Sequence, residues 1–210
     1  PNGKVMKALL KKLERHYKRP VDIEFTVELI PGYPKPGIKV YLLQCRPLSN
    51  QEWSSEVVIP KNIPLTDQVF SSNHLVPQGV VDKIKYIVYV DPVKYGQIPN
   101  SVRIELARII AGLNKQLEKE KFILMGPGRW GSSNIDLGVK VSYADIYNTR
   151  MLIEIAMTRN GATPELSYGT HFFQDLVESK IYPLALYPDT PGEVYNWEFL
   201  KQAPNLLPVL

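Results

Sequence analysis

The sequence predicts a protein of the α/β class, with a helix and a β-hairpin followed by a larger, compact α/β domain that has a mixed sheet; an α+β arrangement stays open. Two observations lead to this prediction. Apolar and polar residues alternate over residues 21–29 and 38–46, as in strands with one buried face. From residue 84 onward, apolar runs typical of buried strands flank a helical pattern, which is the order of a βαβ unit. A chain of 210 residues is long enough for one large or two small domains.

The first 20 residues predict a basic amphipathic helix that ends before Pro20. Its apolar residues recur at helical spacing; they are Val5, Leu9, Leu10, Leu13 and Tyr17. Seven basic residues against one acidic residue give this segment a net charge of +6, whereas the whole chain carries +4. The other residues therefore sum to −2, and the basic character belongs to the helix. Such a helix can bind nucleic acid or a membrane surface, but we favour a solvated basic face and expect neither partner.

The two alternating segments predict an antiparallel hairpin. In the first strand, Asp22 and Glu24 point to the same face, and in the second strand Gln44 and Arg46 do so as well. The connector, residues 30–37, is rich in proline and glycine, which are the strongest turn-forming residues. A hairpin of this kind can bring two carboxylates, an amide and a guanidinium close together.

This set of side chains suits a metal–phosphate ligand. Mg²⁺ is usually held by one or two carboxylates together with substrate phosphates, and an arginine can bind a phosphate through two parallel hydrogen bonds. The alternative is structural, because polar residues on an exposed sheet face are common. Spacing alone does not decide between the two interpretations.

Residues 20–25 and 41–47 resemble the end of the ATP-grasp region of the phosphoenolpyruvate synthase and pyruvate phosphate dikinase family. The family patterns are a D-I-E-[WF] strand and an L-Q-x-R-P strand, and the chain reads Asp-Ile-Glu-Phe and Leu-Gln-Cys-Arg-Pro at the matching positions. The resemblance implies that Glu24 and Gln44 lie at an ATP–metal site, with Asp22 and Arg46 beside them. It also implies ATP and Mg²⁺ as cofactors, and it covers about the first fifth of the chain.

The resemblance implies an ATP-dependent phosphotransferase of the pyruvate, water dikinase type, which forms phosphoenolpyruvate from ATP and pyruvate or acts on another small acceptor. Because the chain opens at Pro1 without an initiator Met, we expect a fragment that is inactive alone. The family's ATP site also needs a lysine and an arginine from an earlier region. On this interpretation, residues 1–50 close the ATP-grasp region, 51–66 are a linker, and 67–210 form a domain of unassigned role.

The second domain is expected to contain five strands and three helices. The strands are predicted at residues 84–90, 122–125, 139–143, 151–156 and 181–187, from their content of β-branched and aromatic residues. The helices are predicted at 102–117, capped by Asn100 or Ser101, and at 171–179 and 194–200.

The segment Gly126-Pro127-Gly128-Arg129-Trp130-Gly131-Ser132-Ser133 is the most distinctive local sequence. It fits G-x-G-x-x-G, but no helix is predicted after Gly131, which argues against a dinucleotide fold. Two interpretations stay open. In one, the glycine amides of Gly126, Gly128 and Gly131, the hydroxyls of Ser132 and Ser133, and Arg129 bind an anion. In the other, the loop is a tight turn anchored by Trp130, with Arg129 in a salt bridge. Together with residues 169–173, the loop also resembles the C-terminal extension of many proteins with a phosphoenolpyruvate/pyruvate-binding domain.

Two histidines, His171 and His74, are candidate reactive groups. His171, near the start of a predicted helix, would have its cationic form disfavoured by the helix dipole, which suits a hydrogen-bonding or general-base role. The alternative is a packed histidine bonded to the backbone. His74 lacks the Gly-Gly-x-x-x-His setting of the family's phosphorylated histidine, so we do not expect it to accept a phosphoryl group.

The composition is typical of a cytoplasmic protein. No segment approaches the about 18 uninterrupted apolar residues that a membrane span needs, and the single cysteine, Cys45, fits a reducing compartment. A homo-oligomer stays open. The competing hypothesis on function is a non-catalytic module that binds an anion or a partner through residues 126–133 and His171.

Overall fold

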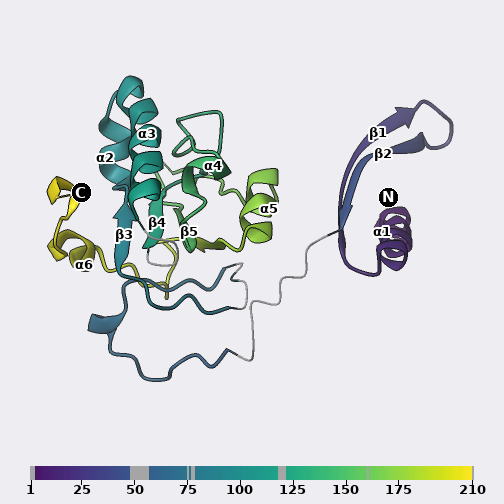
Figure 1. The fold of residues 1–210 in the computed structure, drawn as a ribbon. Coiled ribbons are helices and arrows are strands. Elements are labelled where there is room, and N and C mark those ends of the chain that lie inside the picture. The colour runs from purple at the N-terminus through teal and green to yellow at the C-terminus, as the bar shows by residue number, and fades with distance from the viewer. Residues whose placement is uncertain are drawn as a thin grey trace. The chain divides into compact units, whose positions relative to one another are not determined.

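The computed structural model describes residues 3–47, 57–74, 76, 79–117, 122–159 and 161–209. The chain divides into two compact units, residues 1–50 (unit 1) and residues 51–210 (unit 2), and each is described by itself (Figure 1). Part of the predicted linker, residues 51–56, lies outside the described residues, as do residues 118–121.

Unit 1 consists of the predicted helix and hairpin. Helix α1 spans Gly3–Tyr17, strand β1 spans Val21–Ile30 and strand β2 spans Gly37–Pro47. The strands pair antiparallel. After the helix, Lys18 takes a left-handed conformation with φ 55, which turns the chain toward Pro20. Among residues 3–47, Val21 is the one buried apolar side chain.

A β-bulge interrupts the hairpin beside Glu24. Glu24 pairs with Gln44, but the next residue, Phe25, pairs with Leu42, so Leu43 is the extra residue of β2. Strict alternation predicted that Ile38, Val40 and Leu42 share a face with Gln44 and Arg46. That prediction is wrong, because the bulge shifts the alternation. The three aliphatic residues oppose Leu29, Val27 and Phe25, whereas Gln44 and Arg46 oppose Glu24 and Asp22.

Unit 2 contains a four-stranded sheet in the order β3-β4-β5-β6, which confirms the α/β class. All of its strand pairs are parallel, so the predicted mixed sheet is wrong. Its strands are β3 (Tyr86–Tyr89), β4 (Phe122–Pro127), β5 (Met151–Ile155) and β6 (Tyr182–Leu186). Its helices are α2 (Pro92–Gln97), α3 (Asn100–Gln116), α4 (Tyr143–Ile146), α5 (His171–Glu178) and α6 (Trp197–Gln202), with 3₁₀ turns at Leu65–Asp67 and Leu207–Val209.

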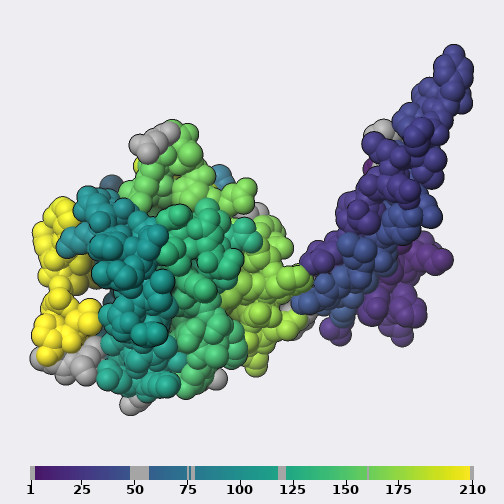
Figure 2. Space-filling view, turned by 90° about the horizontal axis from the view of Figure 1, so that it is seen from above, coloured from purple at the N-terminus to yellow at the C-terminus, as the bar shows by residue number. Residues whose placement is uncertain are grey.

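The sheet has a hydrophobic core on each face, because successive strand residues point to opposite sides. Leu124 and Leu152 pack with Ile110 of α3 and Leu176 of α5 on the helical face. On the other face, Met125, Ile153 and neighbouring strand residues pack against Phe70, Tyr195 and Leu200 from outside the sheet. Figure 2 shows the C-terminal segment, in yellow, beside the teal segment that carries β3 and α2.

Three local predictions in unit 2 differ from the structure. Residues 139–142 form no strand, because the carbonyls of Leu137 and Val139 accept hydrogen bonds from the amides of Arg129 and Gly131 instead of from a strand. Tyr143 begins α4, which Ser142 and Asp145 cap reciprocally. The cap of α3 is Pro99 and makes no side-chain bond, so the predicted caps Asn100 and Ser101 are wrong.

The third difference is helix α2, which the sequence analysis missed. Asp91 Oδ1 accepts hydrogen bonds from the amides of Val93 (2.8 Å) and Lys94 (3.1 Å), and Pro92 occupies the first helical position. An Asp-Pro pair is a helix-start signal of this kind.

Candidate functional site

The polar face of the hairpin brings the four predicted hairpin residues together. Glu24 lies directly opposite Gln44, and Asp22 lies directly opposite Arg46. Opposed residues of an antiparallel pair project to the same face, so all four side chains share it. The two pairs are two residues apart along the strands, which corresponds to about 7 Å. Glu24 and Arg46 are exposed, and Asp22 and Gln44 are half-buried.

Gln44 and Arg46 also contact each other along β2. With its amide oxygen turned toward the guanidinium, Gln44 accepts hydrogen bonds from Arg46 Nη2 (2.6 Å) and from Arg46 Nε. The amide oxygen has two lone pairs, and this arrangement uses both. A cation could therefore bind the Gln44 amide oxygen only after the guanidinium of Arg46 has moved away from it.

The donor set of this face fits a magnesium–phosphate ligand. Within the described residues, no group of three or more His, Cys, Asp and Glu side chains is close enough to hold a metal ion. Mg²⁺ does not need such a cage, because one or two carboxylates with phosphate and water oxygens complete its coordination. Glu24 and Gln44 could supply protein oxygens, and Asp22 lies next to them on the same strand.

Further along the same face, Glu28, Lys39 and Tyr41 contact one another. Tyr41 donates a hydrogen bond to Glu28 Oε2 (2.6 Å), and Lys39 Nζ lies 4.7 Å from the centre of the Tyr41 ring. Glu28 is opposite Lys39 in the register. These residues offer charge-matched control positions for Glu24 and Arg46.

In the loop of residues 126–133, most backbone amides already donate hydrogen bonds to acceptors of the protein itself. The amides of four consecutive residues donate to protein acceptors: Gly128 to Ile155 O (2.9 Å), Arg129 to Leu137 O (2.7 Å), Trp130 to Glu154 Oε1 (2.8 Å) and Gly131 to Val139 O (3.2 Å). These amides do not form an open nest for an anion. Arg129 lies 3.9 Å from Glu165, measured between Nη1 and Oε2. An anion-binding role would therefore depend on Arg129 and the hydroxyls of Ser132 and Ser133, and it stays a prediction.

Trp130 anchors this loop in the core. Its side chain is fully buried, and its indole Nε1 has no hydrogen-bond partner among the described residues. A Cβ added at Gly126 would lie 2.7 Å from the Trp130 ring, and one at Gly131 would lie 2.5 Å from the Phe172 ring. The glycines thus allow close packing. As predicted, no helix follows Gly131 among residues 132–142.

Glu154 is a buried carboxyl group that the sequence analysis missed. It lies in β5 between Gly126 of β4 and Ala185 of β6. Oε1 accepts from Trp130 N, and Oε2 accepts from Ser167 N at 2.6 Å. Burial raises the pKa of Glu154 to about 7, although these hydrogen bonds and Arg129 act in the opposite direction. The signal in the sequence was a lone glutamate within an apolar strand.

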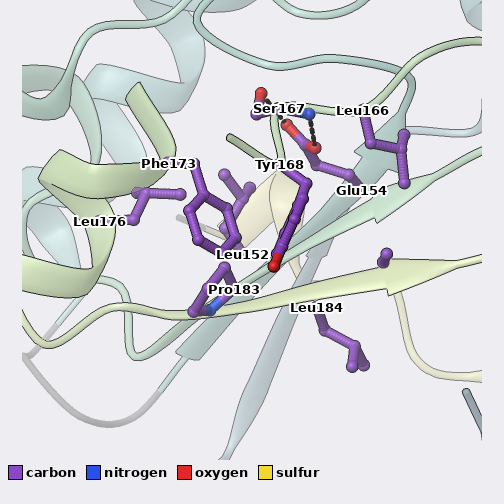
Figure 3. Close-up of a pocket in the computed structure, with 10 residues that line it drawn as sticks. Leu152, Glu154, Leu166, Ser167, Tyr168, Phe173, Leu176, Pro183 and Leu184 are labelled. Atoms are coloured by element: carbon purple, nitrogen blue, oxygen red, sulfur yellow. Dashed lines mark hydrogen bonds between the residues drawn. The ribbon is translucent and has the colours of Figure 1, made fainter. Parts of the chain in front are cut away.

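A small pocket lies beside Glu154, between β5, β6 and α5 (Figure 3). Ser167 and Glu154 lie at one end, and the Tyr168 and Phe173 rings stand edge-to-face with 4.9 Å between centroids. The remaining walls are apolar, from Leu152, Leu166, Leu176, Pro183, Leu184 and Ala185. Tyr168 is 55% exposed and forms the outer wall.

The two histidines lie in different surroundings. His171 is exposed at the first position of α5, next to the cap residue Thr170, whose hydroxyl accepts from Phe173 N (3.3 Å). His74 Nε2 is 3.7 Å from Oε1 of Glu193, whose side chain is fully buried. The general-base role of His171 stays a prediction.

The polar face of the hairpin thus carries oxygen atoms and a guanidinium of the kinds that bind metal ions and phosphates. Comparison with known proteins gives a class of domain that agrees with this chemistry. Residues 3–66 match the family model described as pyruvate phosphate dikinase, AMP/ATP-binding domain. The match indicates an ATP-binding domain of a phosphotransferase of this type and supports the kinship with phosphoenolpyruvate synthase and pyruvate phosphate dikinase. No curated protein and no solved structure matches the chain. None of the described helices is both long and apolar enough to cross a membrane.

Proposed function

We propose that the hairpin of unit 1 forms one wall of the Mg-ATP site of a phosphoenolpyruvate synthase-like phosphotransferase. Glu24 and Gln44 would bind the metal, and Asp22 and Arg46 would lie beside the phosphates. The observation that carries the proposal is the direct opposition of Glu24, which is exposed, and Gln44, which is half-buried, on one face of the hairpin. The family match over residues 3–66 supports it.

Arg46 would have two roles in this site. In the structure, its guanidinium donates to the amide oxygen of Gln44. An incoming phosphate offers Arg46 a stronger, charged acceptor, and the exchange would free the Gln44 oxygen for Mg²⁺. The metal, when bound, would neutralise charge on the phosphate oxygens. Binding of phosphate and metal would therefore be coupled through one side-chain movement.

Phosphoryl transfer itself would need parts beyond this hairpin. The acceptor is proposed to be pyruvate or another small molecule, and the protein is proposed to act in the cytoplasm, in keeping with its single cysteine. We expect the chain alone to bind ATP without turning it over. Unit 2 has no assigned role in this reaction.

The test is calorimetric titration of the full chain with Mg-ATP, comparing Glu24→Ala with Glu28→Ala. Both substitutions remove one carboxylate from the same face of β1, but Glu28 lies four residues further along and bonds Tyr41. Loss of one charge-assisted contact in Glu24→Ala should weaken binding by about tenfold to a hundredfold. Glu28→Ala should change affinity less than about twofold.

Equal losses in the two variants would show a general charge effect and contradict the assignment of Glu24. Arg129→Ala serves as the third arm of the same titration. If it alone abolished binding, the loop of residues 126–133 would be the nucleotide site, and the hairpin proposal would be wrong.

A further inference from the structure

The hydroxyl of Ser167 lies between two acceptors and has one proton to share. Ser167 Oγ is 2.6 Å from Glu154 Oε1 and 2.9 Å from the carbonyl oxygen of Trp130. Ser167 and Glu154 are both buried. Because a serine hydroxyl donates one hydrogen bond, which acceptor it serves depends on whether Glu154 carries a proton.

The two protonation states satisfy these groups differently. When Glu154 is neutral, its own proton can bond to Ser167 Oγ, and the serine proton is then free for the carbonyl of Trp130. When Glu154 is ionised, the serine proton goes to the carboxylate, and the Trp130 carbonyl loses this partner. A buried acceptor left without a donor is destabilising. The hydrogen bonds that Ser167 and Trp130 donate to Glu154 favour its ionised form, but burial of the carboxyl outweighs them. Because the Trp130 carbonyl is also satisfied only in the neutral state, the two segments are held together more firmly when Glu154 is neutral.

The charged groups around Glu154 do not compensate its ionisation fully. Arg129 lowers the pKa of Glu154, but burial outweighs it, and Arg129 also lies near Glu165. On the side of β6, Tyr187 is close enough for Glu154 to contribute to its raised pKa. Helix α5 presents Phe173 and Leu176 to the pocket, which are apolar. The ionised carboxylate is thus poorly stabilised in this site.

The contacts of Glu154 join two loops that are distant in sequence. The carboxyl oxygens of Glu154 accept hydrogen bonds from the backbone amides of Trp130, in the 126–133 loop, and of Ser167, in the turn that caps α5. In that turn, Thr170 donates its backbone amide to Ser167 O (2.9 Å), and Tyr168 forms the outer wall of the pocket (Figure 3). We propose that Glu154 and Ser167 form a proton-operated clamp between these loops, closed when Glu154 is neutral and loosened when it ionises, which opens the pocket beneath Tyr168.

The direction of the pH dependence follows from the shift. The pKa of Glu154 rises from 4.5 to about 7 on folding, so the folded protein holds the proton over this interval more tightly than the unfolded chain does. Stability supplied by the neutral carboxyl is fully present below about pH 4.5. It falls as the pH rises toward 7 and stays low above it.

Amide hydrogen exchange of the full chain, read by NMR between pH 5 and 8, tests the clamp. After correction for the intrinsic rate, the protection of the Trp130 and Ser167 amides should fall by about 50-fold over this range, because opening exposes a carboxyl with an ordinary pKa. The amide of Val90, bonded to Met125 O on another strand, is the reference. It should stay more protected at pH 8 than the two clamp amides.

Two variants make the test specific. Glu154→Gln cannot ionise, so the protection of the Trp130 amide should no longer vary between pH 5 and 8. Ser167→Ala removes the hydroxyl between Glu154 and the Trp130 carbonyl while leaving Glu154 in place. Protection of the Trp130 amide at pH 5 should then drop toward the level that the unmodified protein shows at pH 8. A pH-independent exchange of both clamp amides, a Val90 amide no better protected at pH 8 than the clamp amides, or a pH dependence that survives in Glu154→Gln would overturn the proposal.

Discussion

Trp130→Ala is expected to lower the free energy of unfolding of unit 2 by about 3–5 kcal/mol. The side chain is fully buried in the core between the sheet and the helices, and it packs against Gly126 and Val90. Neighbouring backbone cannot fill the space, since the loop is held by the bonds of residues 128–131 to fixed acceptors. Hydrogen exchange of the slowest β4 amides measures the change for unit 2 alone.

Trp130→Phe provides the matched comparison. It removes a buried N–H that has no partner among the described residues, so part of the lost packing is offset. We expect a cost of about 1–2 kcal/mol for this variant. If Trp130→Ala lowered the stability by less than about 1 kcal/mol, the loop would not be anchored by this ring.

Gly128→Ala is expected to destabilise unit 2 by about 3 kcal/mol or more. Gly128 has φ +64, which an L-residue adopts at a cost of about 1–2 kcal/mol. In addition, a Cβ at this position would collide with the carbonyl oxygen of Leu137, a backbone atom that accepts from Arg129 N. Relief of the collision would break that bond, which adds to the cost of the conformation.

Gly161→Ala separates the two contributions. Gly161 has φ +77, but apart from its chain neighbours no described residue has an atom within 4 Å of a Cβ built there. This variant should lose only the conformational cost, about 1–2 kcal/mol at most. The midpoints of chemical denaturation measure the stability lost in each variant. Equal losses in Gly128→Ala and Gly161→Ala would mean that the Leu137 contact does not constrain the loop.

Local patterns in the sequence predicted the hairpin well but not its bulge. Alternation and the proline-rich turn define two strands, and they place Asp22 with Glu24 and Gln44 with Arg46. A bulge depends on cross-strand register, which period-2 alternation within one strand does not contain. The extra residue Leu43 allows β2 to place its aliphatic residues on one face and Gln44 and Arg46 on the other.

Long-range contacts explain the errors in unit 2. Residues 139–142 have strand composition, but the loop amides of Arg129 and Gly131 use the neighbouring carbonyls at positions 137 and 139. Glu154 could be noticed as an isolated charge in an apolar strand. Its partners, Trp130 and Ser167, lie 24 and 13 residues away, and no spacing rule connects them.

Paramagnetic line broadening can show directly whether Glu24 and Gln44 face one metal–nucleotide complex. Mn²⁺ prefers the same oxygen ligands as Mg²⁺ and broadens the NMR signals of nearby nuclei. On titration of the full chain with Mn-ATP, we expect the strongest broadening at the amides of residues 22–24 and 44–46, with less at Glu28 and Lys39. Broadening centred on residues 128–133, or none in the hairpin at saturating Mn-ATP, would contradict it.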